Sequence, residues 1–419
     1  MARAGRTSVR WLIGFAFGLC ALTAAAENAP ERRVVETWHT YTVNSVDEAI
    51  FLEAVAAFEK AYPHIDVEPV RIPYLQNLAQ FINSSQGGEA PDLIRVSDTE
   101  LGKLGHITVE GLPLLEDLRA HLTPVQRQQV APRALAAMRY GEPLYALPVS
   151  QGCLTLLYNK ALFDARGVAY PDDSWTTDDL IAAAKQLDDG AVRGLALPIK
   201  WSYWFLPFQT GFGGASFDAN GHPTVDSPGS AEALEFFLDF ERVHDIVSSS
   251  VGLESMSTQF QTGKAAMVLD GSWNMNNYLG ADIDVGLATL PAVAETGIRM
   301  GPLLSYFGWS VSKQSDVKEE AAALALWLSS ADVQKAFALQ SYVVPVDLSL
   351  ARDPEVLADP VVSAYLRQAE FGIAVPTNQV TYRVFEQIDV ALELVYKGEL
   401  DAVSALRAAD AEMERALAQ

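Results

Sequence analysis

The sequence predicts an α/β protein built from two lobes, and two observations lead to this prediction. Within residues 34–96, short apolar runs that suit strands alternate with longer segments in which apolar residues recur at helical spacing. This alternation is typical of a parallel sheet with crossover helices. The chain has 419 residues, more than one ordinary domain holds, and 49% of them are hydrophobic, enough for two cores. We therefore expect a mainly parallel sheet flanked by helices in each lobe.

Strands and helices alternate along the first hundred residues. The predicted strands are residues 34–38, 65–70 and 91–96, and the predicted helices between them are residues 45–62 and 75–82. Ser45 and Glu48 form a capping box at the start of the first helix, and Pro63 ends that helix. Because the loops after parallel strands face the ligand crevice, we expect residues 39–44 and 97–100 to line it.

A long extended segment over residues 144–160 suits a passage from one lobe to the other. It is longer than a normal strand and is broken at Pro148 and Gly152. Later in the chain we expect helices over residues 176–187, 231–243, 256–262, 385–396 and 401–417, a helix that begins at residue 316, and strands over residues 265–269 and 283–290. These elements provide the second lobe and complete the first.

Residues 1–26 are predicted to be a signal peptide and no part of the fold. Three arginines precede an apolar run that is too short to span a bilayer, and three alanines at positions 24–26 supply a small-residue cleavage site. We therefore expect export to the periplasm, with Glu27 as the mature start. Residues 17–19 match a lipoprotein cleavage box poorly, so a lipid anchor at Cys20 is not expected.

Charge and cysteine content exclude several classes of function. Loss of the signal peptide leaves Cys153 as the only cysteine, so an intramolecular disulfide is not possible. The same loss removes three arginines and no acids, which takes the net charge from −23 to about −26. A chain this acidic is not expected to bind nucleic acid or polyanions. Its six histidines are scattered singly, and it has no cysteine cluster, phosphate loop or hydrolase motif. We therefore expect no metal, no cofactor and no enzymatic activity.

The stretch 270–278 is unusual for a turn that follows a strand. It places one indole, three carboxamides and a phenol between Trp273 and Tyr278. Aromatic rings offer flat apolar faces, and Asn offers both hydrogen-bond donors and an acceptor. A sugar needs this combination, because its C–H groups stack on rings and its hydroxyls need partners. The alternative is an ordinary helix start, with Ser272 as the cap and Trp273 packed inward.

Residues 201–208 form the densest aromatic cluster of the chain, shortly before a Gly-Gly turn at 213–214. Most of these rings are expected to fill the core of the second lobe. One or two of them are expected to reach a ligand.

Five sets of residues resemble the solute-binding proteins of ABC sugar importers, in the order in which that family carries them. They are Trp38 to Tyr41, Phe58 to Pro63, Ala90 to Leu93, Tyr145 to Pro148 with Leu157 to Lys160, and Gly263 to Met267 with Gly271 to Trp273. Residues 301–312 and 341–346 resemble two further lobe crossings of the same family. The resemblance spans nearly the whole mature chain, and the maltose/maltodextrin-type and multiple-sugar binders are the nearest groups.

The resemblance implies a two-lobed periplasmic-binding-protein fold of type II with three hinge crossings. The crossings are expected near residues 148–154, 302–308 and 342–347. The first lobe would hold residues 27–150 and 308–344, and the second lobe would hold residues 151–307 and 345–419. The resemblance also implies a monomer that captures a neutral mono- to oligosaccharide between the lobes and delivers it to the permease of an ABC importer.

The resemblance and the crevice rule together give candidate sugar-binding residues in both lobes. Tyr203 is similar in position to a stacking residue of the maltose-type family, and Phe385 lies where that family often has a stacking Trp. The full set is Trp38, His39, Tyr41, Asp98, Glu100, Gln151, Tyr203, Trp204, Trp273, Asn274, Tyr306 and Phe385.

One departure from the maltose-type pattern bears on the ligand. That family often has a Trp and a basic/acidic pair after the third strand, whereas residues 95–100 here carry neither. One stacking ring is therefore missing, which argues against maltodextrin as the ligand. A polyamine remains an alternative, because carboxylates around aromatic rings suit a cation.

Two further alternatives need charged groups in particular places. Glycerol phosphate would need a cluster of Arg or Lys, but the sequence does not group the candidates Arg95, Lys200 and Arg383. A glycosidase would need two opposed carboxylates. Asp98 and Asp270, or Glu100, could supply them, but no motif positions them.

Overall fold

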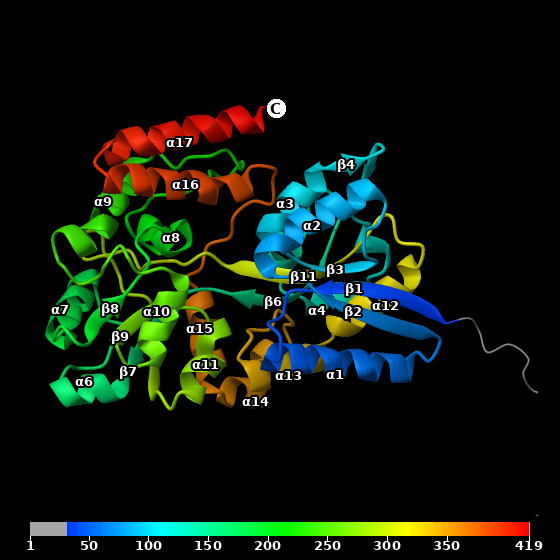
Figure 1. Cartoon of the computed structure of the whole chain (residues 1–419), viewed down its shortest axis with the longest axis horizontal. Helices are drawn as coiled ribbons and strands as arrows, with labels where there is room; N and C mark the ends of the chain where they lie inside the picture. Colours follow the sequence, from blue (N-terminus) through cyan, green and yellow to red (C-terminus); the bar gives the residue numbers. More distant parts are fainter. Residues whose placement is uncertain (1–31, 419) are drawn as a thin grey trace, which may run out of the picture.

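The computed structural model describes residues 32–418, and the predicted signal peptide lies outside the described residues. Two sheets lie in separate lobes, and strands β6 and β11 run between the lobes (Figure 1). None of the helices between residues 32 and 418 has the length and apolar character that a membrane span needs.

The first lobe is built around a five-stranded sheet of order β2-β1-β3-β11-β6. Its strands are β1 (Arg33–His39), β2 (Ile65–Arg71), β3 (Leu93–Ser97), β6 (Leu147–Gly152) and β11 (Ser305–Val311). Its helices are α1 (Val46–Ala61), α2 (Tyr74–Gly87), α3 (Asp98–His106), α4 (Pro124–Gln129), α5 (Pro132–Ala137), α12 (Lys318–Leu328) and α13 (Ala331–Ser341), with a small hairpin of β4 (Thr108–Val109) and β5 (Leu112–Pro113) and a 3-10 turn at Leu118–Ala120. Helices α2 and α3 lie on one side of the sheet and α1 on the other (Figure 1).

The first helix forms for the reasons that the sequence indicates. The Ser45 hydroxyl accepts a hydrogen bond from the Glu48 backbone N–H at 3.1 Å and so caps α1. Phe51, Val55 and Phe58 share one face of the helix and are buried against the sheet. Burial of this apolar stripe stabilises the helix far more than its intrinsic propensity does.

The second lobe is built around a four-stranded sheet of order β10-β7-β9-β8. Its strands are β7 (Thr155–Asn159), β8 (Arg193–Ala196), β9 (Ala265–Asp270) and β10 (Val285–Ala288). The helices of this part of the chain are α6 (Lys160–Arg166), α7 (Thr177–Leu187), α8 (Ser202–Gly211), α9 (Pro228–Arg242), α10 (Leu253–Gln261), α11 (Met275–Gly280), α14 (Pro354–Ala358), α15 (Pro360–Ala369), α16 (Thr381–Tyr396) and α17 (Ala402–Leu417), with a 3-10 turn at Ser272–Asn274. A further 3-10 turn at Leu350–Arg352 follows the third connection between the lobes.

Both sheets are mixed but mainly parallel, as expected, with one reversed strand in each. In the first sheet β1 runs parallel to β2 and β3, but β11 runs antiparallel to both β3 and β6. In the second sheet β8 is parallel to β9, whereas β7 is antiparallel to β9 and β10. A parallel pair needs a long crossover between its strands. Strand β11 instead returns directly from the other lobe, and β7 follows β6 after two residues, so no crossover helix sets the direction of these two reversed strands.

The three connections between the lobes lie side by side and meet at Gln151. Strand β6 ends at Gly152, and β7 of the second sheet begins at Thr155. Gln151 is paired with Tyr306 of β11 on one side and forms a bridge with Val344 on the other. The third connection continues past residue 344 on the first lobe, because the Leu348 N–H donates to the Gln129 carbonyl at 2.7 Å.

A second contact between the lobes joins α3 to the segment before α16. The Thr377 hydroxyl donates to the Ala137 carbonyl at 2.8 Å. Gly102 of α3 lies directly under Asn378, so that a Cβ atom at position 102 would come within 2.2 Å of the Asn378 carbonyl oxygen. The two lobes therefore touch here backbone to backbone.

We expect the substitution Gly102→Ala to destabilise the protein by about 1–3 kcal/mol, because the new methyl group forces α3 and Asn378 apart. Thermal and denaturant unfolding measure the effect. Gly87→Ala is the matched control, since Gly87 also lies in a helix and a Cβ there would meet nothing within 4 Å. Equal stability of the two variants would contradict the close contact.

Candidate functional site

The stretch that follows β9 is organised by the buried carboxylate of Asp270. This carboxylate accepts hydrogen bonds from the Gly271 N–H at 2.8 Å, from the Asn274 side-chain amide at 2.8 Å and from the Tyr278 hydroxyl. Burial raises the pKa of Asp270 to about 6, and these hydrogen bonds oppose the rise. The acid therefore holds the turn between strand and helix in one conformation.

Asn274 belongs to this structural network. Its amide nitrogen donates to Ser257 at 3.0 Å as well as to Asp270, and its oxygen lies 3.4 Å from the Asn277 amide nitrogen. Both polar atoms of the Asn274 side chain therefore have hydrogen-bond partners within the protein. Asn274 therefore stabilises the turn. Its side-chain amide already donates to Ser257 and Asp270, so it is not placed as a ligand-binding group.

Trp273 is the exposed member of the same turn. Its side chain is 46% exposed, although the neighbouring Met275 and Tyr278 are fully buried. The indole lies beside the partly buried ring of Tyr203, with the ring centroids 6.2 Å apart, and beside Gly152 at the end of β6. Trp273 and Tyr203, whose ring planes are inclined at 57° to each other, together form an apolar wall at the edge of the second lobe where the chain crosses over.

The aromatic cluster of α8 divides into core rings and open rings. Trp204 is only 6% exposed, and its indole N–H donates to the Leu269 carbonyl at 2.7 Å, so it is a core residue. Phe205 and Phe208 are buried as well. Trp201 is exposed and Tyr203 is partly exposed, so two of the five rings are open. The structure brings Tyr203 to the candidate site and leaves Trp204 behind it.

Asp98 and Glu100 stand at the start of α3 in the first lobe. Glu100 accepts hydrogen bonds from the Ser97 N–H at 2.8 Å and the Ser97 hydroxyl at 3.0 Å, which completes a capping box. Asp98 is only 4% exposed, accepts from the Thr99 N–H at 3.0 Å and from the Tyr306 backbone, and takes part in no ion pair described between residues 32 and 418. Its charge acts on Tyr203 of the other lobe and helps burial raise the pKa of that phenol.

Burial raises the pKa of Asp98 to about 7 and that of Glu100 to about 6. The physical reason is the loss of water around each carboxylate, which no ion pair described between residues 32 and 418 replaces, although the charge of Arg95 lowers the pKa of Glu100 to a smaller extent. Such a group is a strong acceptor for a neutral donor, for example a hydroxyl.

The structure adds aromatic residues that sequence patterns missed. Tyr74 is 43% exposed, with its ring 6.0 Å from that of Phe307 on β11, and the charges of Asp98 and Glu100 act on its hydroxyl. Tyr74 follows β2 just as residues 39–44 follow β1, so the crevice rule could have found it. Tyr382 of α16 is also exposed, but no sequence signal marks it because its partners come from the other lobe.

Trp38, His39 and Tyr41 are not brought to this site, because they pack in the core of the first lobe. Trp38 is 7% exposed, and its indole N–H donates to Glu36 at 2.7 Å. The rings of His39 and Tyr41 pack against Phe51. Burial lowers the pKa of His39 to about 4, so the imidazole is neutral.

The last three candidates lie near the crossings but differ in access. The Tyr306 side chain is buried, and burial raises its pKa to about 12. Gln151 is partly exposed, and its backbone N–H donates to the Val344 carbonyl at 2.9 Å. Phe385 is partly buried against the core. Of the twelve candidates, the structure groups Tyr203 and Trp273, which are partly open, with Asp98, which is buried.

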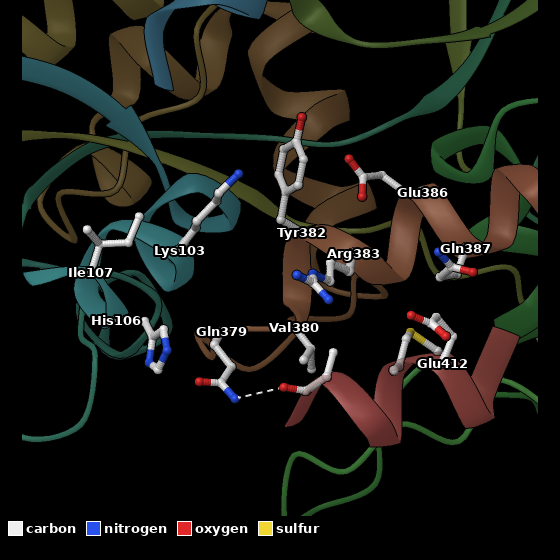
Figure 2. A pocket seen from close by; sticks show the side chains of 12 residues that line it. Lys103, His106, Ile107, Gln379, Val380, Tyr382, Arg383, Glu386, Gln387 and Glu412 are labelled. Atoms are coloured by element: carbon white, nitrogen blue, oxygen red, sulfur yellow. Dashed lines mark hydrogen bonds between the residues drawn. The ribbon is translucent and has the colours of Figure 1, made fainter. Parts of the chain in front are cut away.

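A cavity of about 490 Å³ lies between α3 of the first lobe and helices α16 and α17 of the second. Figure 2 shows Lys103, His106 and Ile107 on one side and Tyr382, Arg383 and Glu386 on the other. The Lys103 ammonium group lies 5.6 Å from the centre of the Tyr382 ring, across the boundary of the lobes. Because Glu100 acts on the Tyr382 hydroxyl, this cavity adjoins the carboxylates of α3.

The cavity carries charges of both signs and is open to solvent. Arg383 faces Glu412 closely enough to lower the pKa of that carboxyl, although Arg415 lowers it more. Within residues 32–418 no three His, Cys, Asp or Glu side chains are grouped so that they could hold a metal ion.

Comparison with known proteins gives this two-lobed arrangement a family. The profile described as "Bacterial extracellular solute-binding protein" matches residues 43–335. The chain belongs to this family. This solute-binding protein is 25% identical over 365 residues to the galactooligosaccharide-binding protein of Bacillus subtilis (strain 168), a match that covers 84% of the chain and 83% of that relative. It is also 25% identical over 373 residues to the maltotriose-binding protein of Pyrococcus abyssi, covering 87% and 77% of the two chains.

Solved structures of similar fold include the GacH receptor of Streptomyces glaucescens GLA.O, determined unliganded and with acarbose. It superposes with a TM-score of 0.83 at 26% identity and covers 93% of this chain and 99% of that one. The maltose/maltodextrin-binding domain MalE from Bdellovibrio bacteriovorus, bound to maltotriose, shows the same fold with a TM-score of 0.81 at 24% identity over 92% and 100% of the chains. The two-lobed fold is thereby confirmed. The relatives are binding proteins, so this family member is a binding protein and not an enzyme.

We expect the free energy of unfolding to decrease as the pH rises from about 4 to about 7, because the pKa of Asp98 is raised in the native state. In that range the native state holds a proton on Asp98 that the unfolded chain has released, because the pKa is raised from 3.8 to about 7, so the free energy of unfolding decreases as pH rises. The substitution Asp98→Asn removes this loss, which amounts to about 4 kcal/mol at neutral pH.

Urea unfolding of both proteins from pH 4 to pH 8 measures the difference. Asp270 is present in both proteins, so its own contribution cancels, whereas Glu100 acts on Asp98 and shares in the difference. The advantage of the Asn variant should grow up to about pH 7 and then level off. A difference that does not depend on pH would show that Asp98 ionises normally.

Proposed function

We propose that this protein captures a neutral sugar, as a mono- to oligosaccharide, between its lobes and delivers it to an ABC importer. One observation carries the proposal: the exposed indole of Trp273 stands beside Tyr203, and Tyr203 lies close to the buried, unpaired carboxylate of Asp98 in the other lobe. Rings suit the C–H faces of a sugar, and a carboxylate suits its hydroxyls. The galactooligosaccharide-binding and maltotriose-binding relatives support the same class of ligand.

The charges near the cleft favour a neutral ligand over an anion. Arg95 is enclosed between the rings of Tyr41 and Phe307 and donates to Thr40 at 2.7 Å. Lys200 lies 3.4 Å from Glu393, in the second lobe. These cations and Arg383 are therefore held apart, which argues against a cluster for glycerol phosphate. A polyamine remains the second candidate, because neither Asp98 nor Glu100 forms an ion pair within residues 32–418, although the charge of Arg95 acts on Glu100.

The remaining parts of the proposal concern the whole chain. The leader over residues 1–26 would direct export to the periplasm, and the mature protein would work as a monomer with the importer's permease subunits as partners. We retain the lobe division of the sequence prediction with one change. The return to the second lobe would follow residue 353, because residues 346–348 are hydrogen-bonded to residues 129–131 of the first lobe.

We expect Trp273→Ala to weaken sugar binding roughly 30–150-fold and to leave the fold intact. The stacked ring contributes on the order of 2–3 kcal/mol from buried area and aromatic contact, which converts to that loss in affinity. Isothermal titration with maltotriose and other neutral oligosaccharides measures it. Leu279→Ala is the control, because Leu279 is an exposed apolar residue of the following helix. If the Trp273 variant is unfolded at room temperature, Trp273 is needed for the fold as a core residue, and its proposed role in sugar binding is contradicted.

Salt dependence should separate a sugar from a polyamine. The affinity for a neutral sugar should stay nearly constant between low and high ionic strength, whereas that for a polyamine should fall steeply because both partners are charged. Calorimetry with a panel of neutral sugars, spermidine and glycerol phosphate makes the comparison. Preference for spermidine or glycerol phosphate over every neutral sugar would overturn the proposed ligand class.

A further inference from the structure

Gly271 has a backbone conformation that does not require glycine. Its φ is −96° and its ψ is 171°, an extended conformation that any residue adopts. The space around it, however, admits no side chain. A Cβ atom at position 271 would lie 2.0 Å from Cζ3, 2.2 Å from Cη2 and 2.3 Å from Cε3 of Trp273. The six-membered ring of the indole occupies the volume that any other residue would fill.

The other neighbour of this ring is a second glycine, from the strand that leaves the first lobe. A Cβ atom on Gly152 would lie 3.6 Å from Cζ3 and 3.9 Å from Cε3 of Trp273, which is ordinary contact. The six-membered part of the indole thus contacts both glycines, one from each lobe. Trp273 is exposed, yet its orientation is restricted by its neighbours.

We propose that Gly271 is a positioning residue for ligand binding. Because Gly271 has no side chain, the Trp273 indole can occupy the adjacent volume and keep the orientation that stacks on ligand. The proposal rests on the proposed function, because it gives Gly271 a role through the ring that binds. An exposed tryptophan on a turn would otherwise sample several rotamers, and ordering it would reduce affinity. Gly271 lets the ring take its binding orientation before the ligand arrives.

The first test needs no ligand. The full mature protein is labelled with 5-fluorotryptophan, and the ¹⁹F resonance of Trp273 is assigned by its absence in Trp273→Phe. Gly271→Ala should shift or broaden that resonance and leave the other tryptophan resonances in place. Gly280→Ala is the matched control, because Gly280 lies nine residues further on, where a Cβ would meet nothing within 4 Å. An unchanged Trp273 resonance in Gly271→Ala overturns the inference.

The second test is a double-mutant cycle with maltotriose as the probe. Gly271→Ala alone should weaken binding at least about tenfold, and it should cause no further loss in a Trp273→Ala background. Unaltered affinity of the single variant, or an equal loss in both backgrounds, contradicts a role through Trp273. If Gly271→Ala fails to fold, adding Trp273→Ala should restore folding, and failure to do so also overturns the inference. If wild-type protein does not bind maltotriose, the proposed ligand is at fault, and the ¹⁹F measurement still decides the role of Gly271.

Discussion

The pairing of the three chain crossings is the constraint on which the rest of the structure depends. Gln151 is paired with Tyr306 on one side and bridged to Val344 on the other, so all three connections are fixed relative to one another. Only two residues separate β6 of the first sheet from β7 of the second. Such short connections bring the edges of the two sheets together. The residues at these edges, Gly152 and the start of α3 among them, therefore meet side chains of the opposite lobe.

Two buried acids at this junction serve opposite purposes. Asp270 is surrounded by donors from its own turn, and this network fixes the backbone that carries Trp273. Asp98 is just as buried but receives hydrogen bonds only from backbone groups and has no cation beside it. A carboxylate in this condition costs stability. Natural sites accept such a cost where function requires it, which fits the proposal that Asp98, unlike Asp270, binds a ligand.

The sequence allowed the alternation of elements, the capping of α1 by Ser45 and the second-lobe turn at Trp273 to be predicted, because these depend on local patterns. The family resemblance favoured Tyr203, but the sequence did not exclude Trp204, since both belong to one aromatic run and the contact with Leu269 that buries Trp204 is not visible in it. Asn274 looked free because its partner Ser257 lies 17 residues away. Trp38 looked available because it ends a strand. Exposure at such positions is decided by tertiary packing, which one sequence does not reveal.

The two lobes contribute unlike surfaces to the junction, and this difference bears on how a ligand would be held. The second lobe offers the faces of Trp273 and Tyr203, which attract any apolar surface but give little direction. The first lobe offers the Asp98 carboxylate, whose hydrogen bonds are directional. A neutral sugar can satisfy both lobes at once, because its hydroxyls donate to the acid while its C–H groups cover the rings. Both contacts form only when the two lobes are close together. The free energy of ligand binding would therefore stabilise the closed arrangement of the lobes.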